Sequence, residues 1–221
     1  MNAKVDIRTC ETLLCESLSS KIYTKGVSLI DDTDIISQVL LGNRSAYAEL
    51  VRKYQARIRK YCSYTLSDSV LAEDAAQDIF FKAFQSLSKF RGDAAFSTWL
   101  QRIAVNHCND LLRKRKSQRQ ESWESLLEAH GDKFNLLFAS NRREANVVEL
   151  RDLAKKIINQ LTEEYRQILI LKEVLGHSYQ EISEILDISN DAVKSRLRRA
   201  RGKLSEYCEQ LLKGEDADDN M

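Results

Sequence analysis

The C-terminal part of the chain has the order of elements that a DNA-binding helix-turn-helix needs. Ser178 and Glu181 have the spacing of a capping box and predict a short helix from Tyr179 to Leu186. Asp187 begins a tight turn, and Ser189 is suited to cap a longer helix that follows it. A short helix, a turn of a few residues and a longer helix together predict a helix-turn-helix.

The second helix of this motif carries a run of bases. From Lys194 to Lys203 there are six bases and no acid. A helix that enters the major groove needs long donors near its N-terminus for base edges and phosphates. The alternative is a solvated basic face, but the capped helix in front of the run favours DNA binding. In a motif that spans Tyr179 to Arg198, the candidate DNA contacts are Lys194, Ser195, Arg198 and Arg199.

A second concentration of bases accompanies aromatic residues in the middle of the chain. From Arg91 to Arg119 the sequence has seven bases and two acids, and Phe90, Phe96 and Trp99 lie at the start of this stretch. Aromatic rings beside bases suit a surface that stacks unpaired nucleotide bases and holds their phosphates. We expect Phe90 in the core, whereas for Phe96 and Trp99 the core and the nucleic-acid surface remain equally open.

The chain offers little for catalysis. It has three histidines, no Gly-rich phosphate loop and no nucleophile beside a base. Its five cysteines are odd in number and scattered, which favours reduced thiols, and their spacing is not that of a metal site. We therefore predict a protein that is not an enzyme, with no catalytic residue, no cofactor and no metal.

The elements that must position these residues are predicted to be helices throughout. The chain of 221 residues has seven glycines and no proline, so it lacks the usual punctuation of turn-rich β folds. The spacing of its apolar residues predicts an all-α protein in which Ser97 or Thr98 caps the fourth helix. The predicted helices cover residues 31–41, 46–64, 72–91, 97–116, 150–161, 162–175, 179–186 and 189–211. A short helix at 10–18 and one helical turn at 123–127 are left open.

Charge is segregated along the chain. The whole sequence has 34 Lys and Arg against 33 Asp and Glu, yet residues 120–150 contain six acids and three bases. No segment has the length and apolar character of a membrane span, and the N-terminus lacks the features of a secretory signal, so we expect a cytoplasmic protein. We expect two small helical domains at 31–117 and 148–213, a flexible linker at 118–147, an unassigned extension at 1–30 and an acidic tail at 214–221.

Two blocks of the sequence resemble the extracytoplasmic-function sigma factors of the sigma-70 family. Helix-turn-helix motifs alone occur in many families, whereas these two blocks in this order and at this spacing are specific. The first block is similar to sigma domain 2 in AEDAAQDIF at 72–80, FRGD at 90–93, FSTWL at 96–100 and RIAVN at 102–106. The second is similar to sigma domain 4 in SYQEI at 178–182 and VKSRLRRAR at 193–201.

This resemblance implies a function in transcription initiation. Sigma factors of this group bind core RNA polymerase, recognise promoter −35 and −10 elements and help to open the duplex. The resemblance also implies an anti-sigma factor as partner, and a membrane-bound one would hold the chain at the inner membrane without direct membrane insertion. It implies docking on the clamp coiled coil of the largest polymerase subunit through Asp74, Gln77, Asp78 and Phe81. It further implies contacts to an unstacked base and phosphates of the −10 DNA by Phe96, Thr98, Trp99, Arg102, Asn106 and Arg113, and reading of the −35 duplex by the helix-turn-helix.

The chain departs from the family at the start of the last helix, and one other class of protein remains open. Asp191 and Ala192 stand where the family often has Gly-Thr, and an acid there suits the helix dipole but repels phosphate. The alternative is a dimeric helix-turn-helix regulator of duplex operators, in which residues 31–117 sense a signal or dimerise. Such a domain has no need of the polar face around Gln77 and Asp78. A pure protein-interaction adaptor would leave both basic clusters unused.

Overall fold

The computed structural model describes residues 31–123 and 157–215, and every regular element in these two ranges is helical. This confirms the predicted all-α class. The N-terminal domain contains α2 (Asp32–Leu40), η1 (Arg44–Ala46), α3 (Tyr47–Leu66), α4 (Ser69–Gln85), η2 (Leu87–Lys89) and α5 (Phe96–Trp123). The C-terminal domain contains α7 (Glu163–Leu169), the π-helical turn η4 (Ile170–Val174), α8 (Tyr179–Leu186) and α9 (Asn190–Glu215).

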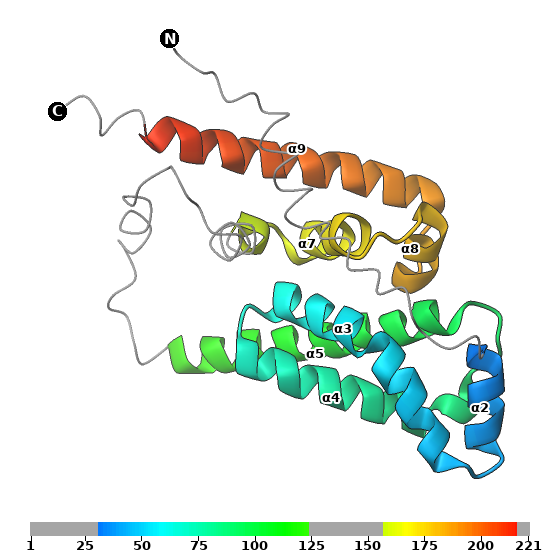
Figure 1. Cartoon of the computed structure of the whole chain (residues 1–221). Helices are drawn as coiled ribbons and strands as arrows, with labels where there is room; N and C mark the ends of the chain where they lie inside the picture. Colours follow the sequence, from blue (N-terminus) through cyan, green and yellow to red (C-terminus); the bar gives the residue numbers. More distant parts are fainter. Residues whose placement is uncertain (1–30, 124–156, 216–221) are drawn as a thin grey trace, which may run out of the picture.

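The N-terminal domain is built on α3, α4 and α5, which pack on one another in pairs, while α2 covers one end (Figure 1). Each helix presents apolar residues at helical spacing to a shared core, as the sequence pattern predicts. Leu50, Ile58, Ile79 and Leu100 are among the fully buried side chains. Asp68 caps α4, since its Oδ1 accepts the N–H groups of the second and third helical residues at 3.1 and 3.0 Å.

Helix α5 differs from its prediction at both ends. The carbonyl of Ala95 accepts the N–H groups of Thr98 and Trp99 at 3.0 and 3.1 Å, so the helix begins one residue before Ser97. The predicted capping by Ser97 or Thr98 is therefore wrong. The helix also continues to Trp123, well past residue 116, so the first residues of the predicted linker are helical. The extension at 1–30, residues 124–156 and residues 216–221 lie outside the described residues.

The helix-turn-helix of the C-terminal domain forms as predicted. Ser178 Oγ accepts the Glu181 N–H at 3.1 Å, and Glu181 Oε2 accepts the Ser178 N–H at 2.7 Å, which completes the capping box of α8. Asp187 makes the turn in a left-handed conformation, with φ at 55°. Ser189 Oγ then accepts the N–H of Ala192 at 3.2 Å and caps α9. The predicted helix at 162–175 forms as α7 followed by η4.

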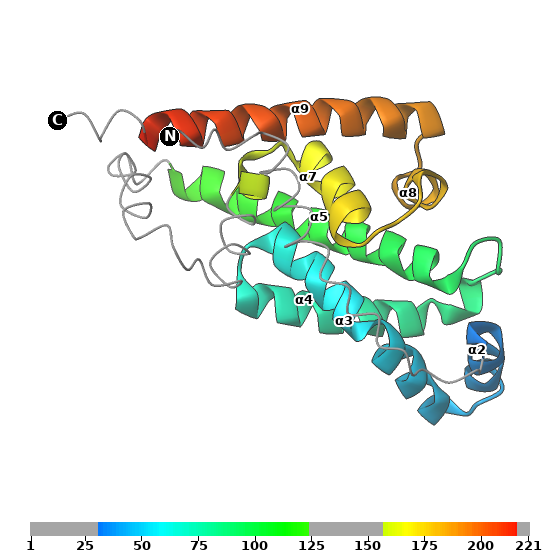
Figure 2. The ribbon, with the colours of Figure 1, turned by 45° about the horizontal axis from the view of Figure 1, so that its top comes forward.

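The two domains pack directly on each other. Helix α8 lies on α5, and η4 lies on α3, so one continuous apolar core runs through both domains. Figure 2 shows α5 between the other helices of the N-terminal domain and the C-terminal domain. Within the described ranges, no helix is both long and apolar enough to cross a membrane.

Candidate nucleic-acid and protein interfaces

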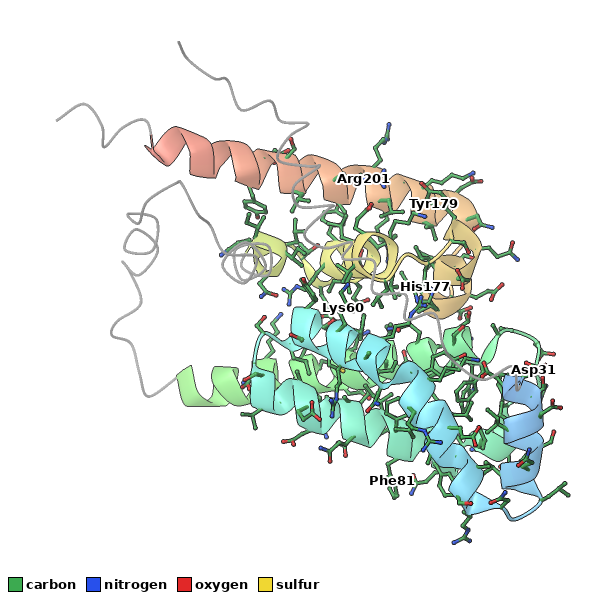
Figure 3. The ribbon with its side chains drawn as sticks, in the orientation of Figure 1. Asp31, Lys60, Phe81, His177, Tyr179 and Arg201 are labelled. Atoms are coloured by element: carbon green, nitrogen blue, oxygen red, sulfur yellow. The ribbon has the colours of Figure 1, made fainter. Side chains whose placement is uncertain are left out.

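Helix α4 divides cleanly into a buried and an exposed face. Its alanine-rich side packs into the core, with Ala72, Ala75, Ala76, Ile79, Phe80 and Ala83 buried. The opposite side carries the predicted polymerase contacts, and all of them are exposed: Asp74, Gln77, Asp78 and Phe81. Phe81 has 62% of its surface exposed, which is unusual for a large apolar side chain. In Figure 3 its ring projects from the side of the N-terminal domain that faces away from the C-terminal domain.

A buried histidine supports the edge of this exposed face. The Lys82 ammonium lies 2.7 Å from His107 Nδ1. Because an ammonium can only donate, Nδ1 is the acceptor and the proton of the neutral ring sits on Nε2. Asp78 Oδ2 lies 3.5 Å from Nε2. Burial and the Lys82 charge lower the pKa of His107 below its ordinary value. The imidazole is thus neutral and ties α5 to both a base and an acid of α4.

The aromatic cluster of the predicted −10 surface lies mostly in the core. Phe96 packs on Tyr54, Phe90 and Trp99, with ring centroids 5.5, 5.7 and 5.5 Å away. Phe96 and Thr98 are each only 3% exposed. Phe96 and Thr98, both expected at the DNA, are thus almost inaccessible in this structure, where Phe96 packs in the core against Trp99. Trp99, in the first turn of α5, is partly buried and packs against the core.

The polar members of the predicted −10 surface are exposed along α5. Arg102, Asn106 and Arg113 recur along the helix and are all on its solvent side. Arg102 Nη2 lies 3.7 Å from Asp187 Oδ2, an acid of the helix-turn-helix turn. Arg113 Nη2 lies 3.3 Å from Asp110 on its own helix. The structure thus places these three side chains on one surface with Trp99, whereas Phe96 and Thr98 are buried.

The basic run on α9 is largely neutralised by acids of the same domain. Among the described residues, four of its six bases have a carboxylate within 4 Å: Lys194 with Asp191, Arg196 with Glu164, Arg201 with Glu173 and Lys203 with Glu206. No such ion pair holds Arg198 or Arg199 in this part of the chain, and both are exposed. Arg199 Nη2 donates to Ser195 Oγ at 2.8 Å, which orders its guanidinium. Arg198 and Arg199 are therefore the bases of this helix best placed to meet phosphates or base edges.

Sequence reasoning missed the charged residues between the two domains. Arg57 and Lys60 of α3 donate to carbonyls at the end of η4, and Arg166 of α7 donates to the Thr65 carbonyl near the end of α3. His177 lies in the same interface and is fully buried. Arg57 and Lys60 share one helix face, but their spacing is equally typical of a solvated face, so no sequence signal identifies them.

The described residues contain no group of three or more His, Cys, Asp or Glu side chains gathered as for a metal. Cys62 and Cys108 are free thiols in the core of the N-terminal domain, with their Sγ atoms 3.9 Å apart. The hydrogen bond with Cys62 and, after it, burial raise the pKa of Cys108 far above its ordinary value, so the thiol is protonated.

Comparison with known proteins identifies the family on both domains. A family described as Sigma-70 region 2 matches residues 50–118, and one described as Sigma-70, region 4 matches residues 144–204. The RNA polymerase sigma-H factor of Pseudomonas aeruginosa is 33% identical over 185 residues, which cover 82% of this chain and 96% of that protein. The ECF RNA polymerase sigma-E factor of Escherichia coli K12 is 32% identical over 188 residues, covering 83% and 97%.

Solved structures show the same fold. CnrH, in complex with the cytosolic domain of CnrY, matches with a TM-score of 0.59 and 25% identity over 80% of this chain and 96% of that one. The sigma factor RpoE of Bartonella quintana, in complex with the anti-sigma factor NepR, matches with a TM-score of 0.56 and 24% identity over 74% and 96%. The chain therefore belongs to the extracytoplasmic-function group of the sigma-70 family of RNA polymerase sigma factors.

Proposed function

We propose that this chain binds core RNA polymerase through α4 and directs it to promoters through α5 and the helix-turn-helix. The single observation that carries the proposal is the exposed face of α4. The opposite side of this helix is entirely core, and the fold itself makes no evident use of Gln77 or of an exposed phenylalanine at position 81. Large exposed apolar side chains rimmed by polar ones are typical of protein-binding surfaces. The protein acts as an initiation factor and has no catalytic activity of its own.

The DNA contacts divide between the two domains. Trp99, Arg102, Asn106 and Arg113 form the surface of α5 that reads the −10 element, with Phe96 and Thr98 supporting it from beneath. An indole ring can stack on an unpaired base, and the two guanidinium groups can hold phosphates. The N-terminal part of α9, with Lys194, Ser195, Arg198 and Arg199, reads the −35 duplex in the major groove.

An anti-sigma factor is the second protein partner in this proposal. CnrH, which shares a quarter of its residues with this chain, was solved with the cytosolic domain of CnrY bound. We infer a partner of the same kind for this chain, one that keeps it from the polymerase. The chain then works in the cytoplasm, and a membrane-bound partner would hold it at the inner membrane until released.

The polymerase contact is tested by a double substitution on α4. Gln77→Ala with Asp78→Ala should abolish co-purification with core polymerase, because both side chains are exposed and their loss leaves the fold intact. The matched control is Asp34→Ala with Gln38→Ala, which removes the same residue types from exposed positions on α2. Co-purification that survives the α4 substitutions would overturn this contact.

The same variant separates the proposal from a dimeric operator-binding regulator. The comparisons with known proteins lend that alternative no support. A regulator of that class would bind duplex DNA with a two-fold footprint in the absence of polymerase, and the α4 substitutions would change nothing in its activity. We expect no such footprint from the chain alone and a loss of promoter-directed transcription in the α4 variant.

A further inference from the structure

The described structure holds the two domains together by reciprocal contacts at helix ends. Arg57 Nη2 donates to the Leu175 carbonyl at 3.1 Å, and Lys60 Nζ donates to the Val174 carbonyl at 3.2 Å. In the other direction, Arg166 Nη1 donates to the Thr65 carbonyl at 3.3 Å. The last carbonyls of a helix lack partners within it and carry partial negative charge, so cations stabilise them. Each domain thus supplies cations to the end of a helix in the other.

His177 lies at the centre of this interface. Gly176, with φ at 70°, turns the chain sharply after η4, and the His177 side chain enters the interface with no exposed surface. Arg57 Nη2 lies 2.9 Å from His177 Nε2. A guanidinium can only donate, so Nε2 accepts and the ring is neutral, with its proton on Nδ1. Figure 3 shows His177 and Lys60 at the boundary between the two domains.

The cations around His177 favour its neutral state, and the Glu181 carboxylate opposes them. Arg57 approaches from α3, Lys172 of η4 donates to the His177 carbonyl at 3.1 Å, and Glu181 Oε1 of α8 lies 3.6 Å from Nδ1. Burial and the Arg57 charge lower the pKa of His177 to about 4, against the opposing effect of Glu181. The neutral ring is therefore a specific acceptor for Arg57, and the contact exists only while the domains are closed.

This closed arrangement is incompatible with simultaneous reading of two promoter elements. Asp187, in the turn of the helix-turn-helix, lies 3.7 Å from Arg102 on the −10 surface of α5. A −35 and a −10 element about 25 base pairs apart are separated by about 85 Å along B-form DNA, at about 3.4 Å per base pair. Even with DNA bending, side chains in ion-pair contact cannot read both elements at once. The domains must separate before the promoter is engaged.

We propose that Arg57, Lys60 and His177 form an interdomain latch, which keeps the chain closed before it reaches a promoter and whose release is a step on the way to initiation. This rests on the proposed function, because the incompatibility is with promoter reading. The latch acts within one chain and needs no anti-sigma factor. Its donors come from α3 and its acceptors from the η4 end and His177, so opening breaks several charge-assisted hydrogen bonds together.

The latch is tested first without polymerase, by hydrogen exchange of the full-length chain followed by mass spectrometry. Arg57→Met keeps most of the aliphatic stem and removes the donors. We expect exchange at residues 102–110 of α5 and 170–177 of η4 to rise at least tenfold, because loss of a single charge-assisted hydrogen bond produces about that change and Arg57 makes two across the interface. The control is Arg59→Met on the same helix, because Arg59 pairs with Glu73 inside the N-terminal domain at 2.5 Å. Lys60→Met serves as a milder second variant if Arg57→Met alters the circular dichroism spectrum.

The regulatory step is tested by the rate of open-complex formation at limiting chain concentration with core polymerase. Latch variants should form open complexes several-fold faster than the wild type, and the Arg59 variant should match the wild type. Unchanged exchange in both latch variants overturns the latch, and raised exchange without faster open-complex formation overturns its role in initiation. A wild-type chain that supports no transcription instead overturns the proposed function and the regulatory role with it, while the exchange data still decide whether the latch closes the domains.

Discussion

Phe81 offers a quantitative test of the α4 surface. The ring is 62% exposed, and a phenylalanine that becomes buried covers roughly 200 Å², so roughly 120 Å² remains to be covered by a partner. At about 25 cal/mol per Å², full coverage is worth about 3 kcal/mol, which a tenfold factor per 1.4 kcal/mol converts to about a hundredfold in Kd. Phe81→Ala should therefore weaken binding to core polymerase by thirty- to about a hundredfold, allowing for the retained Cβ.

The same substitution should leave the folded chain intact. An exposed residue contributes little to the free energy of unfolding, and alanine is the better helix former, so we expect a change within about 0.5 kcal/mol. Ile79, two positions earlier, is fully buried, and Ile79→Ala should lower the free energy of unfolding by about 2 to 5 kcal/mol. Urea titration measures both values, and fluorescence anisotropy of a labelled chain measures Kd for core polymerase.

The matched control is Val70→Ala, another exposed apolar residue of α4, with 71% of its surface accessible and placed near the start of the helix. We expect its Kd to stay within twofold of the wild type. A Phe81→Ala chain that binds core polymerase as tightly as Val70→Ala would refute the reasoning, because it would show that this ring is exposed without being part of the interface.

Three further predictions concern stability and reactivity. Ser178→Ala breaks the capping box of α8 and should lower the free energy of unfolding by about 1 kcal/mol. Urea titration measures this beside Ser205→Ala, a partly exposed serine in the interior of α9 that caps no helix. The free energy of unfolding should fall by about 2 kcal/mol between pH 7 and pH 5. His177 has a pKa of about 4 in the folded chain against an ordinary value of 6.5, so the unfolded chain binds more protons at this residue as the pH falls. A His177→Gln chain whose free energy of unfolding keeps the same pH dependence would contradict this. Cys62 and Cys108 should resist alkylation in native buffer and react in urea, because both are fully buried; mass spectrometry of tryptic peptides reads this out, and rapid native labelling would show that the core is open.

The local features of the fold are those that the sequence predicts best. The capping box at Ser178 and Glu181 involves residues three apart, and its spacing suffices to predict the start of α8. The division of α4 into a core face and an exposed face follows from helical periodicity, so Asp74 and Gln77 could be assigned to the surface, whereas only the resemblance to sigma factors places Phe81 there. These features depend on neighbours along one helix, which the sequence displays directly.

The features that depend on tertiary contacts could not be predicted. Phe96 stands at the edge of a loop with bases nearby, and only the packing of three other rings on it shows that it belongs to the core. Lys60 and the Val174 carbonyl that it contacts are 114 positions apart in the chain. A backbone carbonyl carries no sequence signal, so the interdomain contacts of Arg57 and Lys60 emerge only from the structure.

The central claim, that this chain directs core RNA polymerase to promoters, is tested most directly by run-off transcription. Core polymerase is incubated with the chain and a library of promoter fragments from the genome that encodes it, and the 5′ ends of the transcripts are mapped. We predict start sites that require the chain and that lie downstream of a shared pair of −35 and −10 elements. If core polymerase with the chain starts at no site, while a control sigma factor initiates at its own promoter in the same mixture, the claim is contradicted.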